Sequence, residues 1–457
     1  MKAWSMTGGM ITEVRGRLAQ RFHALAVFMA IAGVGLGACT GPAQSPPIPH
    51  TFMVEDTSKW ALQHPRPDLG AVQLEWFTQG KEEFEQRWVP FPSIGGQWGR
   101  GPLSNAQSCT DCHARNGRGT AASGSPSLVV RLAMPASSPS LDPIYGGQLN
   151  THGILGRVPA EGQIKVHWRE HRVVLHDGEV VMLRAPEAEL RELAYGDLSR
   201  DTRISLRIAP QLVGLGLLEA IEEREIDRLR ARQRTLGFQG RIHRVWDSQT
   251  KTPALGRFGW KASQPSLRQQ AAAAFRDDIG VTSSMFAAEN CSPVQRACAG
   301  TETVTHPELK DEQLDRLTAY LQGLAVPIPR PSSAKGARLF SLLGCDACHA
   351  PKLRSSLAHA STISPYTDLM LHDMGDALAD GLSEFDAKGN EWRTPPLWGL
   401  GLVGSVSGQV NLLHDGRARN AQEAILWHGG HARKSRDAFT ELSRADRAIL
   451  LQFLQSL

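Results

Sequence analysis

The sequence lacks a concentration of charge of one sign. Its 457 residues include 50 Lys and Arg and 46 Asp and Glu, which gives a formal net charge of +4 at pH 7. The basic residues are spread along the chain, so the electrostatic footprint of a nucleic-acid-binding protein is missing. With 41% apolar and 21% charged residues, the composition is that of a globular protein long enough for two or three domains.

The sequence also lacks a hydrophobic run long enough for a comfortable membrane span. The apolar run at residues 24–39 is short and follows a basic segment, so residues 1–38 are predicted to be a signal peptide. The run ends in LGAC, which resembles a bacterial lipobox, and we expect Cys39 to be lipidated. Ordinary cleavage near Ala38 is the alternative. Both outcomes predict a periplasmic protein, and lipidation would anchor it to a membrane facing the periplasm. Residues 39–70 then form a Pro-rich tether.

Cysteine is scarce, with seven in the chain, and four of the seven fall in two copies of one motif. The motif is C-x-x-C-H, at residues 109–113 and 345–349. It is the attachment signal for haem c, in which the thiols form thioethers with the vinyl groups and the histidine ligates the iron. The predicted attachment residues are Cys109, Cys112, Cys345 and Cys348, with His113 and His349 as iron ligands.

Two other interpretations of the paired cysteines explain less of the motif. Four thiolates from the two copies could hold a tetrahedral zinc ion, but both adjacent histidines would then have no role. A thioredoxin-like site needs one C-x-x-C after a strand and no histidine. Export also favours haem c, because its attachment takes place outside the cytoplasm.

Two further cysteines, Cys291 and Cys298, are separated by a short segment that contains Pro293. In an exported protein, cysteines left over from haem attachment most simply pair with each other. We therefore predict a disulfide that contributes about 2 kcal/mol to stability. A metal-binding or catalytic role is the alternative.

The chain repeats itself in the same order in two halves. GKEEF and GARLF precede the two C-x-x-C-H motifs, PQLVGLGL and PPLWGLGL follow them, and LTAYLQGL and LLQFLQSL end the halves. The repeat predicts two cytochrome c-like haem domains, at residues 71–325 and 326–457, joined at the Pro-rich segment 326–333. The fold is predicted to be mainly α, because apolar residues recur at helical spacing. A small β-hairpin is expected in the longer N-terminal domain, around an Asp-Gly turn at residues 171–186.

A family resemblance covers essentially the whole mature chain. It is carried by GPLSNAQSCTDCHARNGRG, RIAPQLVGLGLLEAI, LGRFGWKASQPSLRQQAAAAF, PYTDLMLHDMGDALADG, TPPLWGLGL and LLHDGRARNAQEAILWHGG. The sequence resembles the bacterial dihaem c-type oxidoreductases, a family assigned as peroxidases and often labelled thiol oxidoreductases. It is more distantly similar to dihaem cytochrome c peroxidases and MauG-type enzymes.

The resemblance implies a set of cofactors and partners. These are two covalently bound haem c groups, hydrogen peroxide as substrate at the first haem, and a small redox protein or cytochrome as electron donor. The relatives also carry a calcium ion between the haems, for which this sequence shows no ligand cluster.

The resemblance also predicts the second axial ligand of the C-terminal haem. In dihaem peroxidases a turn similar to His-Asp-Gly-Arg precedes this ligand by a similar spacing, and the matching residue here is His428. The C-terminal haem is thus predicted to be ligated by His349 and His428, a six-coordinate arrangement suited to electron transfer. The alternatives are Met370, Met374 and His372, while His414 is expected at the haem edge and His431 in solvent.

The internal repeat predicts that the N-terminal haem is open on one side. Aligning KA in LGRFGWKAS with RA in LLHDGRARN puts the position of His428 among the alanines 272–274. Alanine cannot ligate iron, so the haem held by His113 should keep a position at which peroxide binds. His152 is the main rival ligand.

Peroxide cleavage needs a group that moves a proton between the two oxygens. Gln270 matches a glutamine on the corresponding peroxidase helix, and Asp277 and Asp278 lie near the position of the peroxidase glutamate. Gln270 and Asp278 are the predicted catalytic residues, with Glu219 as a further candidate. For each acid, a solvated surface charge is the alternative.

The sequence thus predicts an oxidoreductase in which electrons enter at the C-terminal haem and pass to the N-terminal haem, where peroxide is reduced. Trp260 and Trp398 are candidates for a relay between the haems, or for packing against porphyrin. Two other functions stay open. One is a dihaem electron-transfer protein without a substrate, and the other is a dihaem oxygenase acting on an organic or protein substrate.

Overall fold

The structure is a computed structural model that describes residues 50–457, apart from 136–140, 302–306 and 358–360. The described residues belong to one compact unit. The predicted signal peptide and the predicted lipidation site Cys39 lie outside the described residues. Within the described part, no helix is both long enough and apolar enough to cross a membrane.

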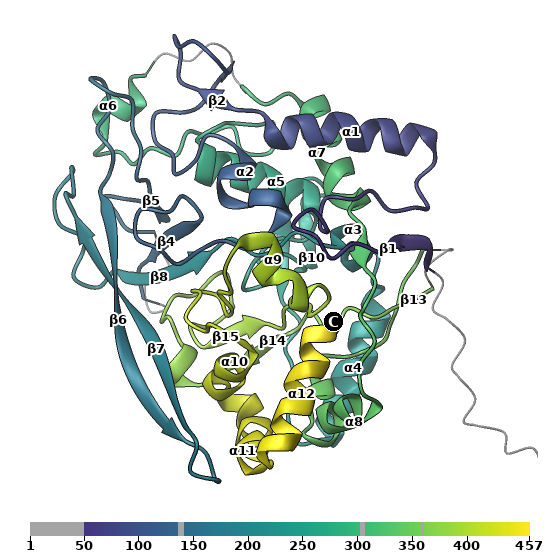
Figure 1. The fold of residues 1–457 in the computed structure, drawn as a ribbon. Helices are drawn as coiled ribbons and strands as arrows, with labels where there is room; N and C mark the ends of the chain where they lie inside the picture. The colour runs from purple at the N-terminus through teal and green to yellow at the C-terminus, as the bar shows by residue number, and fades with distance from the viewer. Residues whose placement is uncertain (1–49, 136–140, 302–306, 358–360) are drawn as a thin grey trace, which may run out of the picture. The chain divides into compact units, whose positions relative to one another are not determined.

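The described helices are mostly short and occur in both halves of the chain (Figure 1). In chain order they are α1 Ala71–Glu85, α2 Cys109–Cys112, α3 Leu215–Glu219, α4 Glu223–Thr235, α5 Leu267–Ala274, α6 Arg296–Ala299, α7 Asp311–Gly323, α8 Ala334–Leu342, α9 Val403–Ser407, α10 Ala421–Trp427, α11 Arg433–Glu441 and α12 Arg444–Ser456. A π-helical turn, η3, covers Phe275–Ile279 directly after α5.

The described strands form one three-stranded sheet, in the order β5-β4-β8, and several two-stranded pairs. They are β1 Met53–Val54, β2 Trp88–Val89, β3 Gln97–Trp98, β4 Leu128–Ala133, β5 Gln148–Leu149, β6 Gln163–Val174, β7 Val180–Arg191, β8 Arg203–Ile208, β9 Arg244–Asp247, β10 Thr252–Leu255, β11 Val326–Pro327, β12 Leu353–Arg354, β13 Thr362–Ile363, β14 Leu371–Asp373 and β15 Glu391–Arg393.

The prediction of a mainly α fold is wrong. Helices make up 32% of the structure and strands 21%. The prediction gave too much weight to helical spacing at the ends of the halves and too little to alternating, β-branched stretches between them. In β4, for example, Leu128, Val130 and Leu132 are buried on one face, and antiparallel pairing with β5 and β8 satisfies the backbone.

The predicted β-hairpin is present and longer than expected. Strands β6 and β7 pair antiparallel over their whole length, from Gln163↔Arg191 to Val174↔Val180. Gly178 in the connecting turn has a φ of 83°. Glycine adopts this conformation without the steric penalty that a side chain would bring.

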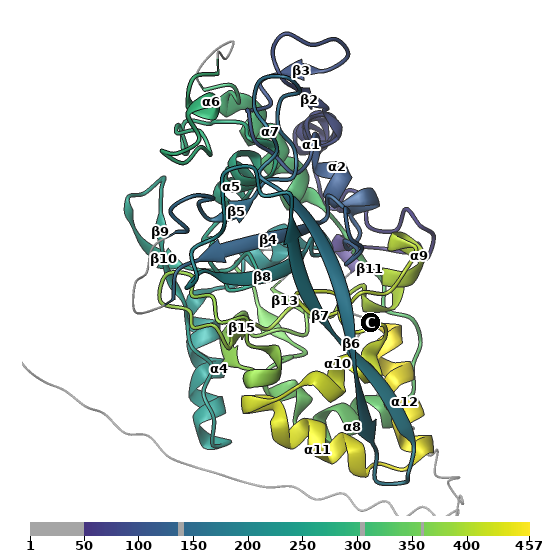
Figure 2. The same cartoon turned by 90° about the vertical axis from the view of Figure 1, so that its left-hand side faces the viewer.

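The hairpin extends from the first half of the chain (residues 71–325) onto the second half (residues 326–457), as both views show (Figure 1, Figure 2). Leu175 and Leu183 are buried in the hydrophobic cluster that includes α8, α10, α11 and α12. Arg447 of α12 donates to Asp177 and Glu179 near the hairpin tip, at 2.6 and 2.7 Å. The two halves therefore share part of one hydrophobic core.

The repeated glycines of the sequence mark matching helix crossings in the two halves. Helix α1 packs against α7 at Gly80, where an added Cβ would lie 1.9 Å from the Arg316 carbonyl oxygen. Helix α8 packs against α12 at Gly336, where an added Cβ would lie 2.5 Å from the Cβ of Phe453. Neither crossing has room for a larger residue, because the packed interior leaves no free space there.

The other two repeated motifs contact each other in the same way in each half. An added Cβ at Gly216 would lie 2.3 Å from the Gln322 carbonyl oxygen, and one at Gly401 would lie 1.8 Å from that of Gln455. The sequence repeat is therefore also a structural repeat, which places a similar helix pair beside each C-x-x-C-H motif.

Candidate active site

Both C-x-x-C-H motifs line one cavity of about 510 Å³. All six motif residues contribute to its wall: Cys109, Cys112, His113, Cys345, Cys348 and His349. Most of the other lining side chains are apolar, and a limited set of polar groups reaches the space. Such a lining is typical of sites for large apolar cofactors.

Local hydrogen bonds shape the first motif. Helix α2 begins after Ser108, where Asp111 Oδ2 accepts from the backbone N–H groups of Gln107 and Ser108, at 2.8 and 3.2 Å. One turn later, the N–H of His113 donates to the Cys109 carbonyl at 2.9 Å. This single helical turn brings both thiols and the imidazole to the cavity wall.

None of the four motif cysteines is part of a disulfide, and their surroundings fit haem attachment better than the alternatives. Burial raises the pKa of Cys109 and of Cys345 to about 12. Thiol–disulfide exchange depends on thiolates, which such buried surroundings disfavour. The zinc interpretation is wrong, because the motif cysteines form no four-thiol cluster among the described residues.

His113 lies partly buried beside the first pair of thiols, and desolvation lowers its pKa to about 4. The neutral imidazole that results is the form that ligates a metal. Its Nδ1 is enclosed without a hydrogen bond of normal geometry, although the carbonyls of Pro210 and Gly117 are near enough to raise the pKa. His113 therefore fits the ligand role that the motif predicts.

Two imidazoles with fixed orientation line the cavity near the second motif. His349 Nδ1 donates to the Tyr366 carbonyl at 3.0 Å, and His428 Nδ1 donates to the Ala424 carbonyl at 2.6 Å. A carbonyl only accepts, so Nδ1 carries the proton in both rings and Nε2 keeps its lone pair for a metal. Burial lowers the pKa of His349 to about 4, with a further contribution from His428. Both residues line the cavity with an Nε2 that could hold an iron.

The rival ligands of the second haem are placed differently. Burial opposes protonation of His372, but the Asp368 carboxylate 2.7 Å from its Nε2 outweighs burial and raises its pKa well above the usual value. A protonated imidazole has no lone pair for iron. Met370 is buried in the core away from the cavity, whereas Met374 borders it.

Helix α5, which the repeat aligns with α10, offers no ligand to the first haem site. Ala273 and Ala274, two of the three aligned alanines, line the cavity. Among the described residues, every lining histidine other than His113 belongs to the second half. His152, the predicted rival, is exposed and is absent from the cavity wall.

The π-turn η3 brings two neighbouring carboxyl groups to the cavity, and their surroundings differ. Burial raises the pKa of Asp278 to about 6, and Gln148 Nε2 donates to its Oδ1 at 2.8 Å. Asp277 is partly buried, but Arg131 at 3.0 Å and Arg276 together outweigh desolvation and hold its pKa below the usual value. Asp278 can therefore exchange a proton near neutral pH, while Asp277 keeps its charge.

The predicted catalytic residues Gln270 and Asp278 both line the cavity. Asp278 lies close to the first motif, because its charge raises the pKa of Cys109 and its carbonyl accepts from the backbone N–H of Ala106 at 2.9 Å. Glu219 does not line the cavity. Its Oε1 accepts from the N–H of Leu267 at 2.8 Å, which caps the first turn of α5.

Of the two tryptophans predicted as relay candidates, only one lines the cavity. Trp260 lines the cavity, and its Nε1 donates to the Ile208 carbonyl at 2.9 Å. Trp398 is buried in the hydrophobic core and is not part of the cavity wall. Trp260 is therefore the one of the two that fits a relay position.

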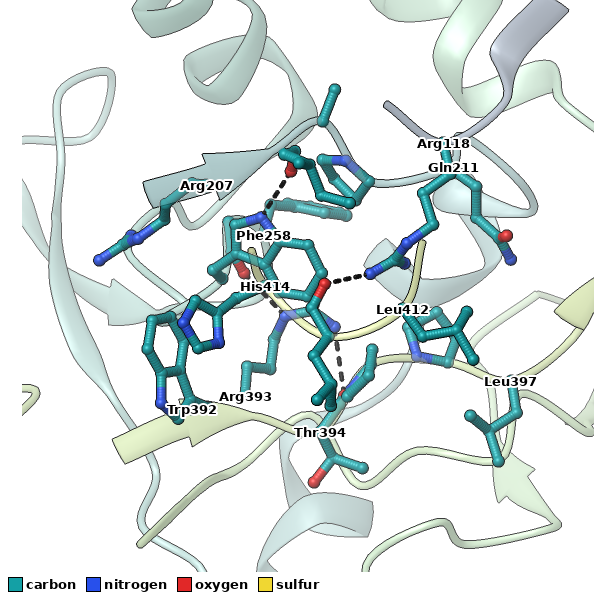
Figure 3. Close-up of a pocket in the computed structure, with 18 of the residues that line it drawn as sticks. Arg118, Arg207, Gln211, Phe258, Trp392, Arg393, Thr394, Leu397, Leu412 and His414 are labelled. Atoms are coloured by element: carbon teal, nitrogen blue, oxygen red, sulfur yellow. Dashed lines mark hydrogen bonds between the residues drawn. The ribbon is translucent and has the colours of Figure 1, made fainter. Parts of the chain in front are cut away.

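Several cavity residues were missed by the sequence reasoning (Figure 3). Trp392 lines the wall and stacks on His414, with 3.7 Å between ring centroids, while Lys261 Nζ lies 4.0 Å from the same indole. Arg118 and Arg393 enter from opposite halves of the chain. Only their location in the sequence could have indicated these two arginines. Arg118 lies inside a stretch shared with the family, and Arg393 directly precedes another.

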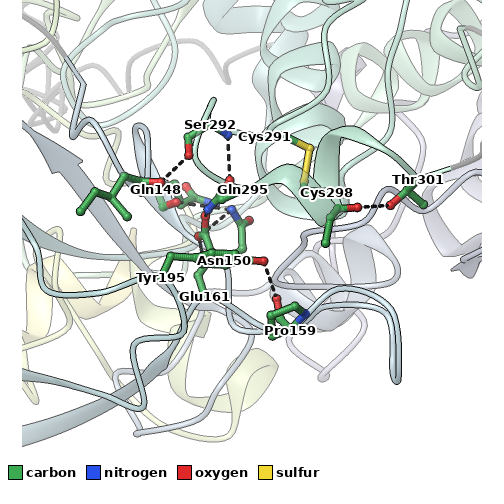
Figure 4. Close-up of a disulfide and its surroundings, with 12 residues drawn as sticks. Gln148, Asn150, Pro159, Glu161, Tyr195, Cys291, Ser292, Gln295, Cys298 and Thr301 are labelled. Carbon is green, nitrogen blue, oxygen red and sulfur yellow. Dashed lines mark hydrogen bonds between the residues drawn. A yellow bond between two sulfur atoms is a disulfide. The ribbon is translucent and has the colours of Figure 1, made fainter.

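A disulfide joins Cys291 and Cys298, with 5.8 Å between their Cα atoms (Figure 4). Its loop carries Gln295, which donates to the buried carboxyl group of Glu161. Asn150 Nδ2 donates to the same carboxyl group at 3.0 Å, and burial raises the pKa of Glu161 to about 7. Neither cysteine lines the cavity, so the bond fits a structural role.

The described residues contain one cluster of potential metal ligands: Cys348, Asp368 and His372. Calcium takes about six to eight oxygen ligands. This cluster offers one sulfur, one nitrogen and one carboxylate ligand, and Cys348 is a predicted haem-attachment residue. The cluster therefore does not provide the calcium site that the resemblance implies.

Comparisons with known proteins give one informative match. No curated protein matches the chain. Among solved structures, it is similar to Kuenenia stuttgartiensis hydrazine synthase pressurised with 20 bar xenon, with 13% identity, 94% of this chain and 100% of that chain covered, and a TM-score of 0.36, which is too low to establish a shared fold. The family model described as "Di-haem oxidoreductase, putative peroxidase" matches residues 49–134 and 133–457. These matches span nearly the whole described chain and both C-x-x-C-H motifs, so the protein belongs to the dihaem oxidoreductase family.

Proposed function

We propose that this protein is a c-type dihaem peroxidase. The observation that supports this most is that one cavity joins two attachment motifs with different surroundings. At the second motif, His349 and His428 both present a free Nε2. At the first, the α5 positions that the repeat aligns with His428 are alanines, and Ala273 and Ala274 line the cavity. An iron with two imidazoles suits electron transfer, whereas an iron with a free position can bind peroxide.

In this proposal the second haem site receives electrons from a small redox protein or cytochrome. They pass to the first site, where one hydrogen peroxide takes up two electrons and two protons and yields two water molecules. Trp260 borders the cavity from the segment before α5, a position suited to a relay. Haem, when bound, supplies the redox-active iron and the position at which peroxide coordinates.

The chain's own residues supply the proton chemistry. Asp278, with a pKa of about 6, can take the peroxide proton and return it to the departing oxygen. Gln148 Nε2, which donates to Asp278 Oδ1 at 2.8 Å, keeps the carboxyl group in place. Gln270 can donate a hydrogen bond where negative charge develops as the oxygen–oxygen bond breaks.

The proposal includes the cellular setting. Covalent attachment at the four motif cysteines requires export, and the predicted lipobox adds a lipid anchor at Cys39 on a membrane that faces the periplasm. Mass spectrometry of the mature protein tests both points. The expected mass includes two haem groups and a diacylglyceryl modification, and a C39A variant should lose the lipid and keep both haems.

The experiment that tests the function uses holoprotein from a host with cytochrome c maturation. Carbon monoxide should bind to one haem of the fully reduced protein, and reduced cytochrome c should be oxidised in the presence of hydrogen peroxide. No carbon monoxide binding and no turnover would identify an electron-transfer protein instead. Carbon monoxide binding without peroxide turnover, but with oxidation of an organic substrate, would identify an oxygenase.

A further inference from the structure

Two arginines line the cavity without a carboxylate partner (Figure 3). The described cavity wall contains five arginines, and three of them pair with aspartates: Arg131 with Asp277, Arg207 with Asp380 and Arg436 with Asp437. Arg118 and Arg393 form no ion pair with any described residue. The pairing of the other three shows that this chain normally neutralises such charges.

The two unpaired guanidinium groups are held by neutral backbone carbonyls. Arg393 is 8% exposed, and its Nε donates to the Gly259 carbonyl at 2.9 Å. Arg118 donates through Nη2 to the Leu413 carbonyl at 2.5 Å and through Nε to that of Asn411. Each arginine therefore reaches across to the other half of the chain, and both are fixed in position before any ligand binds.

The carbonyls do not cancel the positive charge. Burial lowers the pKa of Arg118 and of Arg393 to about 10, so both remain charged at neutral pH. Asp415 acts on Arg118 and Asp368 acts on Arg393, but neither makes an ion pair with these arginines, and each already pairs with another cation, Arg417 or His372. A charge removed from water without a counter-ion in contact is unfavourable. Guanidinium groups bind carboxylates through two parallel N–H donors, a geometry that lysine cannot reproduce. The occupant of the cavity is therefore expected to bring negative charge to these two positions.

We propose that Arg118 and Arg393 are the carboxylate anchors of the cavity and that they bind haem propionates. This inference rests on haem occupancy, which the proposed function also requires, and not on peroxide reduction. Each arginine donates hydrogen bonds to the opposite half of the chain. Propionates bound to these arginines would therefore hold the haems where the two halves meet. Positive charge beside a haem stabilises its reduced form, so both residues would raise the reduction potential of the haem they contact.

The test measures the reduction potentials of holoprotein by spectroelectrochemistry, with haem content measured separately as the pyridine haemochrome. In R118Q and in R393Q, the redox equilibrium of a haem should shift toward the oxidised form by about tenfold, which is about 59 mV for a one-electron couple. The shift should depend on pH, because a propionate without its arginine takes up a proton more readily. R169Q is the control, since Arg169 is an exposed arginine that pairs with Glu187 and does not line the cavity, and it should shift the redox equilibrium of neither haem more than about twofold.

Two outcomes would overturn the propionate assignment, and a third would contradict the proposed function. Normal haem content with unchanged potentials in both R118Q and R393Q would overturn the assignment. If R393Q does not fold, R393K keeps the charge and should retain most of the potential, while R118Q is measured independently. A saturable shift on adding sodium acetate to the wild type, lost in R393Q, would show that a diffusible carboxylate occupies the site and would overturn the propionate assignment. Low haem content in the wild type would instead contradict the proposed function.

Discussion

The two haem sites are built on the same repeat and differ in what their helices present to the cavity. Helix α10 ends at Trp427 and is followed by His428, whose Nδ1 donates to the Ala424 carbonyl and whose Nε2 keeps its lone pair. Helix α5 presents Ala273 and Ala274 instead, and continues into a π-turn that carries Asp278. In the proposed function, one scaffold would thus supply a closed site and an open, acidic site. The difference between the two sites lies in a few side chains, which the shared helix pairs position.

The largest expected effect is on the open site. In D278N, peroxide turnover should fall by a factor of about 100 to 10,000, because the group that moves the proton is lost. In the wild type, turnover should rise as pH increases through about 6, since the carboxylate form of Asp278 accepts the proton, and this rise should be absent in D278N. Steady-state kinetics across pH measure both effects.

The control for D278N is D201N, which changes an exposed aspartate and should leave the rate and its pH profile unchanged. The absorption spectrum of D278N should match that of the wild type. Wild-type turnover in D278N would show that the acidic π-turn does not distinguish the two sites.

The second effect converts the closed site into an open one. In H428A, the second haem should lose one axial nitrogen, and the carbon monoxide bound per reduced protein should double. Electron delivery from the donor should slow, because a haem that changes coordination on reduction reorganises more. Carbon monoxide titration measures the stoichiometry, and H431A, at an exposed residue of the cavity rim, serves as the control. An unchanged stoichiometry in H428A would transfer the ligand role to another residue, such as Met374.

The third effect tests whether the two halves are coupled by the hairpin. Leu175 is 2% exposed in the core of the second half, so L175A should lower the free energy of unfolding by about 2–5 kcal/mol. The neighbouring Val174 is 50% exposed, and V174A should change it by less than about 0.5 kcal/mol. Denaturant unfolding of the holoprotein, followed through the haem absorption, compares the two. Equal stability of the two variants would mean that the hairpin does not support the second site.

The smallest effect concerns the disulfide in the first half of the chain. Replacing Cys291 and Cys298 together by serine should lower stability by about 2 kcal/mol, because the loop they close is short. Carbon monoxide binding and turnover should not change, since neither cysteine lines the cavity. Thermal unfolding of the double variant, with the reduced wild type as control, measures the loss. Altered carbon monoxide binding would instead place the disulfide in the active site.

Features encoded in short stretches could be predicted from the sequence, and those set by tertiary contacts could not. The C-x-x-C-H motifs, the Asp-Gly hairpin and the repeated glycines each depend on neighbouring residues. The strand content was underestimated because strands such as β14 and β15 are three residues long and form only by pairing with each other. Such strands are too short to show a periodic pattern.

The same distinction between local features and tertiary contacts applies to the candidate site. The sequence suggested Asp277 and Asp278 but could not separate their pKa values, because Arg131 and Gln148 reach them from β4 and β5. The unpaired state of Arg393 likewise depends on which carboxylates the fold brings near it. The place of a residue within one segment could be predicted from the sequence. Which charged groups of other segments lie near it, and how they shift its pKa, required the structure.

Electron paramagnetic resonance of the fully oxidised holoprotein tests the central difference between the two sites most directly, because it reports the spin state of each haem. A haem with imidazole nitrogen on both sides is low-spin, and one with a protein ligand on a single side is high-spin. The account predicts one signal of each kind, with the low-spin signal lost in H428A. Two low-spin signals, or one haem per chain, would contradict it.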